Sequence, residues 1–503
     1  MAPELTGLIG TRGKPHTVVS DNGTELTSSV ILRLSQERRI EWRYIHRERL
    51  RTFADLRKTA LPAMDGVPSC SFRLKLDGPI LLTSLCLPVH VASMDRRNFL
   101  AICALAASGA VHAQSTPAGR NRSGQFTFRD LPSPVDFHAH VTRPVRLASA
   151  EVLVVRGGHQ FVRVRSTDGD EGVIKANSRM EEVMSLFHQI AVPAFSKDDL
   201  RDLPTIIDQV YTAQYKFAGL AFWTAIGHLE LAVWDMLGKA MGKRCVDMMG
   251  PVLRTEIPIY VSSLDRKSTG AQEAEAVAKA VAMTGARGAK IKVGGRMSRN
   301  VDAFPGRSED VVKAVRKAMG DDFVIYADAN GSYDAPAAIE LVRMLEDYGV
   351  AVLEEPCPFE DFEMTAQVTR AARRIRIAGG EQDSAMERWR WYHDNKGLDV
   401  LQPDFMYNGG MLRTLRVQRM AAERGVGVAP HYPRNGMETV ELLHFAAQAS
   451  NLYGLQEYRL KPRTLDFPHS PVIEPKNGML TLPEGPGFGV TIDPAIWKDA
   501  VKL

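Results

Sequence analysis

From Glu256 onward the chain alternates short apolar runs with amphipathic stretches, and this alternation constrains the fold more than any other feature. Eight β-rich runs follow one another: IPIYVSS, AKIKVGG, FVIYADAN, AVLEEP, RIAGGEQ, VLQPDF, VGVAPHY and LYGLQEYR. Helical stretches such as SEDVVKAVRKAMG and AAIELVRMLEDYG separate them. Eight strands with intervening helices predict a parallel barrel over residues 256–460. An open doubly wound sheet is the alternative, and it is disfavoured because no G-x-G-x-x-G follows the first run.

Residues 146–255 have the pattern of a smaller α+β unit. Two strand-like runs, LASAEVLVVR and QFVRVRST, flank a Gly-Gly turn. Three apolar-periodic helices follow, and the last contains HLELAVWDMLGK. We expect this unit to cap the barrel, with residues 461–503 completing the cap.

The front of the chain differs from the rest in charge. Residues 1–93 hold 13 Lys and Arg against nine Asp and Glu, so they carry all of the net charge of +4. The stretch RGKPHTVVSDNGTELTS resembles the catalytic core of insertion-sequence transposases of the retroviral-integrase type. In that family the Asp of the DNG motif, here Asp21, is one of three metal-binding carboxylates. The resemblance covers only about the first 45 residues and lacks the partner carboxylates. We therefore interpret 1–93 as a non-native extension without nucleic-acid function.

Residues 94–113 have the architecture of a secretory signal. MDRRNFLAICALAASGAVHA combines paired arginines, a short apolar run and small residues at its end, and it resembles a twin-arginine signal. A buried core helix is the alternative. Because a signal must be N-terminal, we expect translation to start at Met94, with export to the periplasm; otherwise the protein is cytoplasmic. Residues 114–145, polar and Pro-rich, are expected to be a linker.

Polar residues cluster where the barrel strands are predicted to end. The set, in chain order, is Lys290, Lys292, Asp328, Asn330, Glu354, Glu381, Asp404, His431 and Glu457. In a parallel barrel these positions share the C-terminal rim, where catalytic groups are found. Seven consecutive strand ends of this kind predict a shared functional site.

The chemistry of these residue types suggests metal-assisted proton transfer. Asp328, Glu354 and Glu381 are hard oxygen ligands that suit Mg²⁺, or Mn²⁺, and an ion-pair network with the two lysines is the alternative. Lys290 and Lys292 alternate along one strand, so both face inward, and we expect them to depress each other's pKa. The alternative is that both are exposed lysines on the surface.

Two further strand ends complete the predicted set. Asp404 and His431 lie on consecutive strands, where a carboxylate can fix the imidazole tautomer. Glu457 could donate a proton or hydrogen bond to a substrate oxygen if it is held neutral.

The ordered set KxK, DxN, EEP, GE, D, H and E, together with HLELAVWDMLGK, resembles the enolase superfamily, specifically its mandelate-racemase-like branch. The resemblance runs from about Arg146 to the C-terminus. It implies a modified (β/α)7β TIM barrel with an N-terminal α+β capping domain. It further implies Asp328, Glu354 and Glu381 as metal ligands, with Glu354 preferred over Glu355.

The resemblance also assigns roles to the remaining residues. Lys292 is implied as a base, with Lys290 beside it contacting the substrate carboxylate. His431 is implied as the opposite acid or base with Asp404 as its partner, and Asn330 and Glu457 as contacts to substrate or intermediate. Two departures stand out: the loop 156–160 between the first cap strands is very short, and GGRMSRNVDAF is inserted after Lys292.

The implied activity is Mg²⁺-dependent abstraction of the proton next to a carboxylate to give an enediolate. We expect an acid-sugar dehydratase; a racemase or epimerase using Lys292 and His431 as two bases is the alternative. A non-catalytic sugar-acid binding protein is the alternative of another class, and the presence of both bases argues against it. The expected partner is a small carboxylate, without nucleic acid or membrane, and a homo-oligomer is expected.

Overall fold

A computed structural model of the chain describes residues 17–20, 41–44, 133–459 and 468–503. The chain divides into two units, Met1–Arg122 and Ser123–Leu503. In the first unit the described residues form two parallel strands, β1 (Thr17–Ser20) and β2 (Glu41–Tyr44). The predicted signal at 94–113, Asp21 and the linker up to residue 132 lie outside the described residues, and the interpretations placed on them stay predictions. None of the helices in the described ranges is long and apolar enough to cross a membrane.

The predicted (β/α)7β barrel is confirmed. Its parallel strands have the order β12-β11-β10-β9-β8-β7-β6-β13. They are β6 (Glu256–Ser262), β7 (Gly288–Lys292), β8 (Val324–Asp328), β9 (Val352–Glu354), β10 (Arg376–Gly379), β11 (Val400–Leu401), β12 (Gly427–Val428) and β13 (Gln456–Arg459). The ring closes beside β13, because the Tyr453 amide donates to the Val428 carbonyl at 3.0 Å. Each of the eight strands overlaps one of the eight apolar runs; six lie wholly within their run, and β6 and β7 begin one residue before it.

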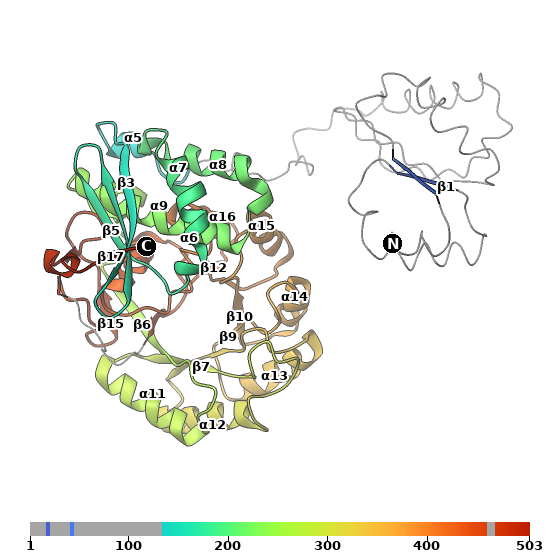
Figure 1. The fold of residues 1–503 in the computed structure, drawn as a ribbon. Helices are drawn as coiled ribbons and strands as arrows, with labels where there is room; N and C mark the ends of the chain where they lie inside the picture. Colours follow the sequence, from blue (N-terminus) through green and yellow to red (C-terminus); the bar gives the residue numbers. More distant parts are fainter. Residues whose placement is uncertain (1–16, 21–40, 45–132, 460–467) are drawn as a thin grey trace, which may run out of the picture. The chain divides into compact units, whose positions relative to one another are not determined.

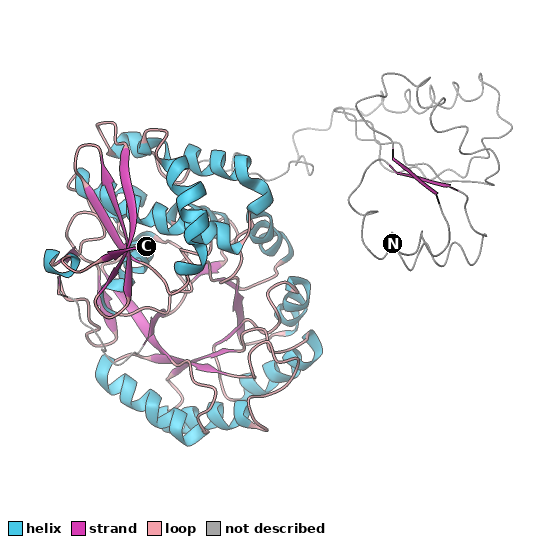
Figure 2. Ribbon diagram, in the orientation of Figure 1, coloured by secondary structure: helices cyan, strands magenta, loops and turns pink. Residues whose placement is uncertain are grey.

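Seven helices connect these strands and lie outside the ring of strands (Figure 2). They are α11 (Gly270–Thr284), α12 (Arg307–Met319), α13 (Ala335–Asp347), α14 (Phe362–Ala371), α15 (Met386–Asn395), α16 (Met411–Ala422) and α17 (Val440–Gln448). The first of them shows how local sequence sets the bounds. Thr269 and Gln272 form a capping box at the start of α11, and Gly285 ends it in the left-handed conformation, with φ 71°.

The capping domain is an antiparallel sheet packed on helices (Figure 1). Its strands are β3 (Leu147–Val155), β4 (His159–Ser166) and β5 (Glu171–Lys175), and β17 (Val501–Lys502) from the C-terminal end pairs with β3. Its helices include α7 (Val192–Phe195), α8 (Leu203–Gln214) and α9 (Leu220–Ala240). The C-terminal segment thus adds a strand to the cap sheet, while β15 (Met479–Thr481) pairs with β6 of the barrel.

The described part of the predicted linker is packed rather than extended. α5 (Phe137–His140) buries Phe137 against Trp234 of α9, with ring centroids 4.8 Å apart. Val141 and Val145 are fully buried as well. The compact structure therefore begins before Arg146, because apolar side chains spaced through 135–145 fill the cap core.

α9 joins the cap to the barrel, and it is buried on all sides from Phe222 to Gly238. Its Glu230 accepts hydrogen bonds from the Met411 amide at 2.7 Å, the Leu412 amide at 2.9 Å and the Trp234 indole at 2.7 Å. Two of these donors are free N–H groups at the start of α16, which have no partner within their own helix. Gly410, with φ 110°, lets the carboxylate approach this closely.

We expect Glu230→Gln to destabilise the protein by about 1–3 kcal/mol, because an amide offers one acceptor oxygen and turns N–H donors toward the donors at the start of α16. Thermal unfolding monitored by circular dichroism measures the effect. Glu275→Gln, the same chemical change on the exposed face of α11, is the matched control and should leave the midpoint unchanged. Equal midpoints for the two variants would contradict this account.

Candidate active site

The strand-end residues converge on a buried network of charges at one end of the barrel. Lys290 Nζ donates to Glu354 Oε1 at 2.8 Å and Oε2 at 3.0 Å, and lies 3.0 Å from Glu457 Oε1. Lys292, the other inward lysine of β7, pairs with Asp328 of β8. The two lysines are 1% and 4% exposed, so the alternative of two surface lysines is wrong.

A second set of contacts lies at the far side of the carboxylates. His431 Nδ1 is 3.0 Å from Asp404 Oδ2, and its Nε2 is 3.2 Å from Glu381 Oε2. Asp404 is itself fixed, because its Oδ1 accepts the amides of Met406 at 2.8 Å and Tyr407 at 3.0 Å. Burial lowers the pKa of His431, but Glu381 and the bond to Asp404 outweigh burial and raise it to about 10. The structure thus brings together the two residues that sequence analysis pairs.

Asn330 connects the lysine side of the site to its carboxylates. Its backbone amide donates to Asp328 Oδ1 at 2.9 Å, and its side-chain amide donates to Glu355 Oε2 at 3.2 Å. Asn330 and Glu355 both have positive φ, 41° and 45°. Non-glycine residues held in this region carry strain that is typical of functional sites.

Two pKa directions expected from the sequence are wrong. Burial lowers the pKa of Lys290, but Glu354 and Glu457 outweigh it, so the pKa is raised well above its usual value rather than depressed. Burial raises the pKa of Glu457, but Lys290 and His431 outweigh it and lower the pKa to about 2, so this carboxyl is charged rather than neutral. The first expectation fails because carboxylates outnumber the second lysine around Lys290, and the second fails because Glu457 lies near two basic groups, Lys290 and His431.

Lys290 has little freedom to meet a substrate in this arrangement. Its ammonium already faces two oxygens of Glu354 and one of Glu457, and Asp328 Oδ2 lies 3.8 Å away. An ammonium has three N–H donors, and these neighbours engage them. In this structure Lys290 therefore holds carboxylates in place, while the contact with a substrate carboxylate that the resemblance implies stays a prediction.

The three carboxylates predicted as metal ligands fit Mg²⁺ by their chemistry. Asp328, Glu354 and Glu381 end three adjacent strands and supply the hard oxygens that this ion prefers. Burial raises the pKa of Glu354 to about 7, and the nearby carboxylates add to that effect. The neighbouring Glu355 has a buried Oε1 without a hydrogen-bond partner. A divalent cation would stabilise these carboxylates by compensating their buried negative charge and contacting the unsatisfied oxygen.

Ion pairs hold these carboxylates in the present conformation. Among the residues that the structure describes, no group of three or more His, Cys, Asp and Glu side chains is arranged to hold a metal ion. Instead Lys292 binds Asp328, Lys290 binds Glu354 and His431 binds Glu381. The ion-pair network that the sequence left as an alternative is therefore present, and metal binding requires these side chains to exchange partners.

Two polar residues near Glu354 and Glu457 were not singled out from the sequence. Gln402 Nε2 donates to Glu354 Oε2 at 2.7 Å, and Ser262 Oγ donates to Glu457 Oε1 at 2.7 Å. Both occupy strand-end positions, of β11 and β6, so the rule that found the charged residues could have found them too. They restrict the carboxylates that they touch.

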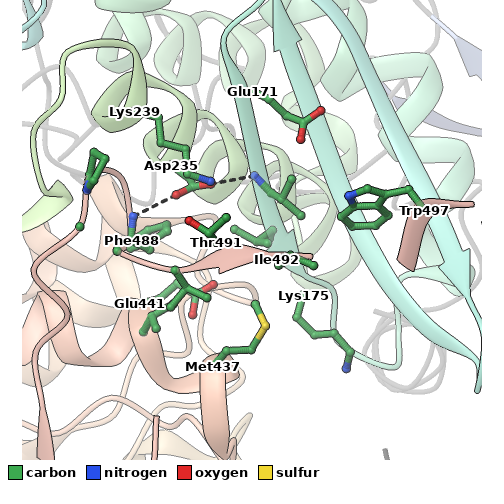
Figure 3. A pocket seen from close by; sticks show the side chains of 17 residues that line it. Glu171, Lys175, Asp235, Lys239, Met437, Glu441, Phe488, Thr491, Ile492 and Trp497 are labelled. Atoms are coloured by element: carbon green, nitrogen blue, oxygen red, sulfur yellow. Dashed lines mark hydrogen bonds and ion pairs between the residues drawn. The ribbon is translucent and has the colours of Figure 1, made fainter. Parts of the chain in front are cut away.

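A separate cavity of about 340 Å³ lies away from this network. Residues of β5, α9, α17 and the C-terminal segment line it, and none of the nine strand-end residues is among them (Figure 3). Asp235 fixes one wall, since it accepts the amides of Val173 at 2.8 Å and Phe488 at 2.9 Å. The cavity lies at the junction of the cap with the C-terminal segment.

The structure combines a (β/α)7β barrel, an α+β cap and a cluster of acidic residues at the C-terminal ends of the barrel strands. Active sites of barrel enzymes lie at these strand ends. Comparison with known proteins indicates the family. The family described as enolase C-terminal domain-like matches residues 272–496. The arabinonate dehydratase of Saccharolobus solfataricus is 28% identical over 63% of this chain and 83% of that protein. The L-talarate/galactarate dehydratase of Salmonella typhimurium is 28% identical over 73% of this chain and 87% of that protein.

Solved structures agree. A mandelate racemase/muconate lactonizing protein from Paracoccus denitrificans, complexed with magnesium, is 25% identical with a TM-score of 0.66, covering 71% of this chain and 99% of that one. The match over residues 272–496 and these relatives support membership of the enolase superfamily.

We expect Mg²⁺ to raise the unfolding midpoint of protein treated with EDTA, because the ion would bind carboxylates that only the folded chain brings together. At a hundredfold excess over Kd the stabilisation should be about 2.7 kcal/mol. Differential scanning fluorimetry measures it. Asp328→Asn, Glu354→Gln and Glu381→Gln should each remove the shift, whereas Glu363→Gln, on the exposed face of α14, should keep it. A full Mg²⁺ shift in the Glu381→Gln variant would exclude that ligand.

Proposed function

We propose that this enzyme, of the lyase or racemase class, is an acid-sugar dehydratase: it removes the proton next to the carboxylate of a sugar acid and expels a β-hydroxyl as water. One observation carries the proposal. Lys292 and His431 contact opposite ends of the carboxylate arc, Lys292 through Asp328 and His431 through Glu381. A substrate carboxylate bound at the arc would therefore have a proton-transfer group on each side.

Asp328, Glu354 and Glu381 would hold Mg²⁺, and the similar Paracoccus protein was solved in complex with magnesium. When bound, the ion supplies positive charge that stabilises the negative charge developing on the substrate carboxylate. The remaining chemistry belongs to side chains of this chain.

Lys292 Nζ is proposed to take the proton from the carbon next to the carboxylate. Its position is fixed by Asp328 and by Asn330 Oδ1, which accepts from it at 3.2 Å. His431 Nε2 is proposed to give a proton to the departing β-hydroxyl, so that water leaves and the enol formed becomes a 2-keto-3-deoxy acid. Asp404 holds His431 through Nδ1 and so aims Nε2 at the site. Lys292 is buried and the His431 side chain is only 15% exposed, so little water competes for these protons.

The same geometry favours one second candidate. If the group opposite the base returns a proton to the same carbon instead, the configuration inverts and the enzyme is a racemase or epimerase. The two-sided placement of Lys292 and His431 supports either outcome, and the named relatives include sugar-acid dehydratases. Loss of the β-hydroxyl from the product distinguishes a dehydratase from a racemase or epimerase, which leaves it in place.

Exchange of the substrate proton with solvent in D₂O, followed by NMR over a panel of sugar acids with Mg²⁺, tests the proposal. We expect exchange and a 2-keto-3-deoxy product from the same acid. Lys292→Ala and His431→Asn should each lower exchange by about 10²–10⁴-fold, on substrates of opposite configuration. Lys279→Ala, an exposed residue of α11, is the control. Exchange absent for every acid that binds would favour a non-catalytic binding protein.

Asp404→Asn separates proton donation from proton removal. The amide no longer fixes the His431 tautomer, so we expect dehydration to fall by about 10²-fold or more, while exchange that depends on Lys292 changes little. Product formation and isotope exchange are measured on one sample. An equal fall of both rates would contradict a role of Asp404 that acts through His431 alone.

A further inference from the structure

Two arginines on the loops after β6 and β7 contact Asn330 and form no ion pair with a carboxylate in the part of the chain that the structure describes. Arg266 lies on the loop after β6, and its Nη2 donates to Asn330 Oδ1 at 2.7 Å, while its Nε donates to the Gly294 carbonyl at 3.3 Å. Arg296 lies on the loop after β7, and its Nη2 reaches the same Asn330 Oδ1 at 3.4 Å. Within the described residues neither guanidinium forms an ion pair with a carboxylate. They therefore differ from the two lysines of β7, whose charges are matched.

These guanidinium groups are close to the proposed base. Lys292 Nζ donates to Asn330 Oδ1 as well, so three cationic side chains share one amide oxygen. Lys292 is paired with Asp328, whereas neither arginine has an ion-pair partner of its own among the described residues. Burial lowers the pKa of Arg266, and repulsion from Arg296 and Arg307 adds to it, although Asp328 opposes the shift. An anion placed between the two arginines would relieve this repulsion.

The two loops are held rigidly, so the arginines are in place before a ligand binds. Arg307 is fully buried, and it donates to the carbonyls of Lys292 at 2.7 Å, Ser268 at 2.9 Å and Asp265 at 3.0 Å. It thereby cross-links the loops that carry Arg266 and Arg296. A preorganised pair of this kind binds an anion at a smaller cost in conformational entropy.

The insertion after Lys292 has a strained conformation that presents Arg296. Arg296, Met297 and Asn300 have φ of 63°, 50° and 69°. Backbone bonds hold the strain: the Arg296 amide donates to Ser332 Oγ at 2.9 Å, and the Met297 amide donates to the Asn330 carbonyl at 3.0 Å. Strain kept by such bonds is typical of ligand-binding loops.

We infer that Arg266 and Arg296 bind a second anionic group of the substrate, so that the enzyme prefers sugar acids with a carboxylate at both ends. This inference rests on the proposed function, because the first carboxylate is taken to lie at Asp328, Glu354 and Glu381. The second carboxylate would bind where both guanidinium groups point, with Asn330 released to the lysine and the substrate. A planar guanidinium matches a carboxylate with two parallel N–H donors.

Isothermal titration calorimetry with the full chain and Mg²⁺ tests the inference through matched pairs: D-galactonate against galactarate, and D-gluconate against D-glucarate. The members of a pair differ only in a terminal hydroxymethyl or carboxylate. We expect the diacid to bind about 10- to 100-fold more tightly in at least one pair. Arg266→Met and Arg296→Met should each remove most of that preference while changing the affinity for the monoacid little. Arg299→Met, an exposed residue of the same loop, should keep it.

The outcomes separate this inference from the proposed function. If Arg296→Met removes a preference for the diacid, the inference is supported even when no acid exchanges its proton. Calorimetry detects binding whether or not the bound acid reacts. Equal affinity within every pair, including no binding of either member, would overturn it. So would an equal loss for monoacid and diacid in both variants, since the arginines would then serve the reacting carboxylate. The exposed position of Arg296 makes its variant informative if Arg266→Met fails to fold.

Discussion

The ammonium of Lys290, 1% exposed and surrounded by Glu354, Glu457 and Asp328, is the interaction on which the interior of the barrel depends. Parallel strands end on one rim, so a barrel that carries acids on β8, β9, β10 and β13 gathers their charges in one buried place. Burying a carboxylate is costly unless an opposite charge and hydrogen bonds meet it. Lys290 and Lys292 provide that compensation in the centre, and His431 provides it at the edge. Each side chain is therefore held by its neighbours in this structure, and binding of a metal ion would replace some of these ion pairs.

Much of this arrangement could be predicted because it follows from strand periodicity alone. The apolar runs located all eight barrel strands, and the position of a polar residue at the end of a run was enough to place Lys292 beside Asp328 and His431 beside Asp404. The prediction failed where the answer depends on the packing of side chains across the ring. Nothing in the local sequence around Lys290 shows that Glu457, from the other end of the barrel domain, lies 3.0 Å away, so the direction of its pKa shift was wrong. The packed segment around Phe137 was missed for a similar reason, since its partner Trp234 is far along the chain.

The cap contributes to the site mainly by holding the loops beneath it. α9 touches the barrel so closely that a Cβ on Gly227 would lie 2.5 Å from the Met406 carbonyl, and Glu230 binds the start of α16. Met406 lies two residues after Asp404 and donates its amide to that carboxylate. The contact between cap and barrel therefore reaches the residue that orients His431. A change in the packing of α9 would be felt in the geometry of the site, although no residue of α9 belongs to the strand-end network.

The short loop between β3 and β4 and the insertion after β7 are the two departures from the family pattern. Both affect which part of the chain can place charged side chains near the substrate. The hairpin between β3 and β4 leaves only Arg156, Gly157 and Gly158 as its turn, and both glycines have positive φ, so this turn is too short to form a flexible lid. The insertion after β7 is instead pinned to the loop after β8 through Asn330 and Ser332. Charges on barrel loops of this kind are positioned by the same backbone that positions Lys292, whereas charges on a cap lid would have to be brought in by closure. If Arg266 and Arg296 bind a second anionic group as inferred, such a site would distinguish substrates by that group without the entropy cost of ordering a lid.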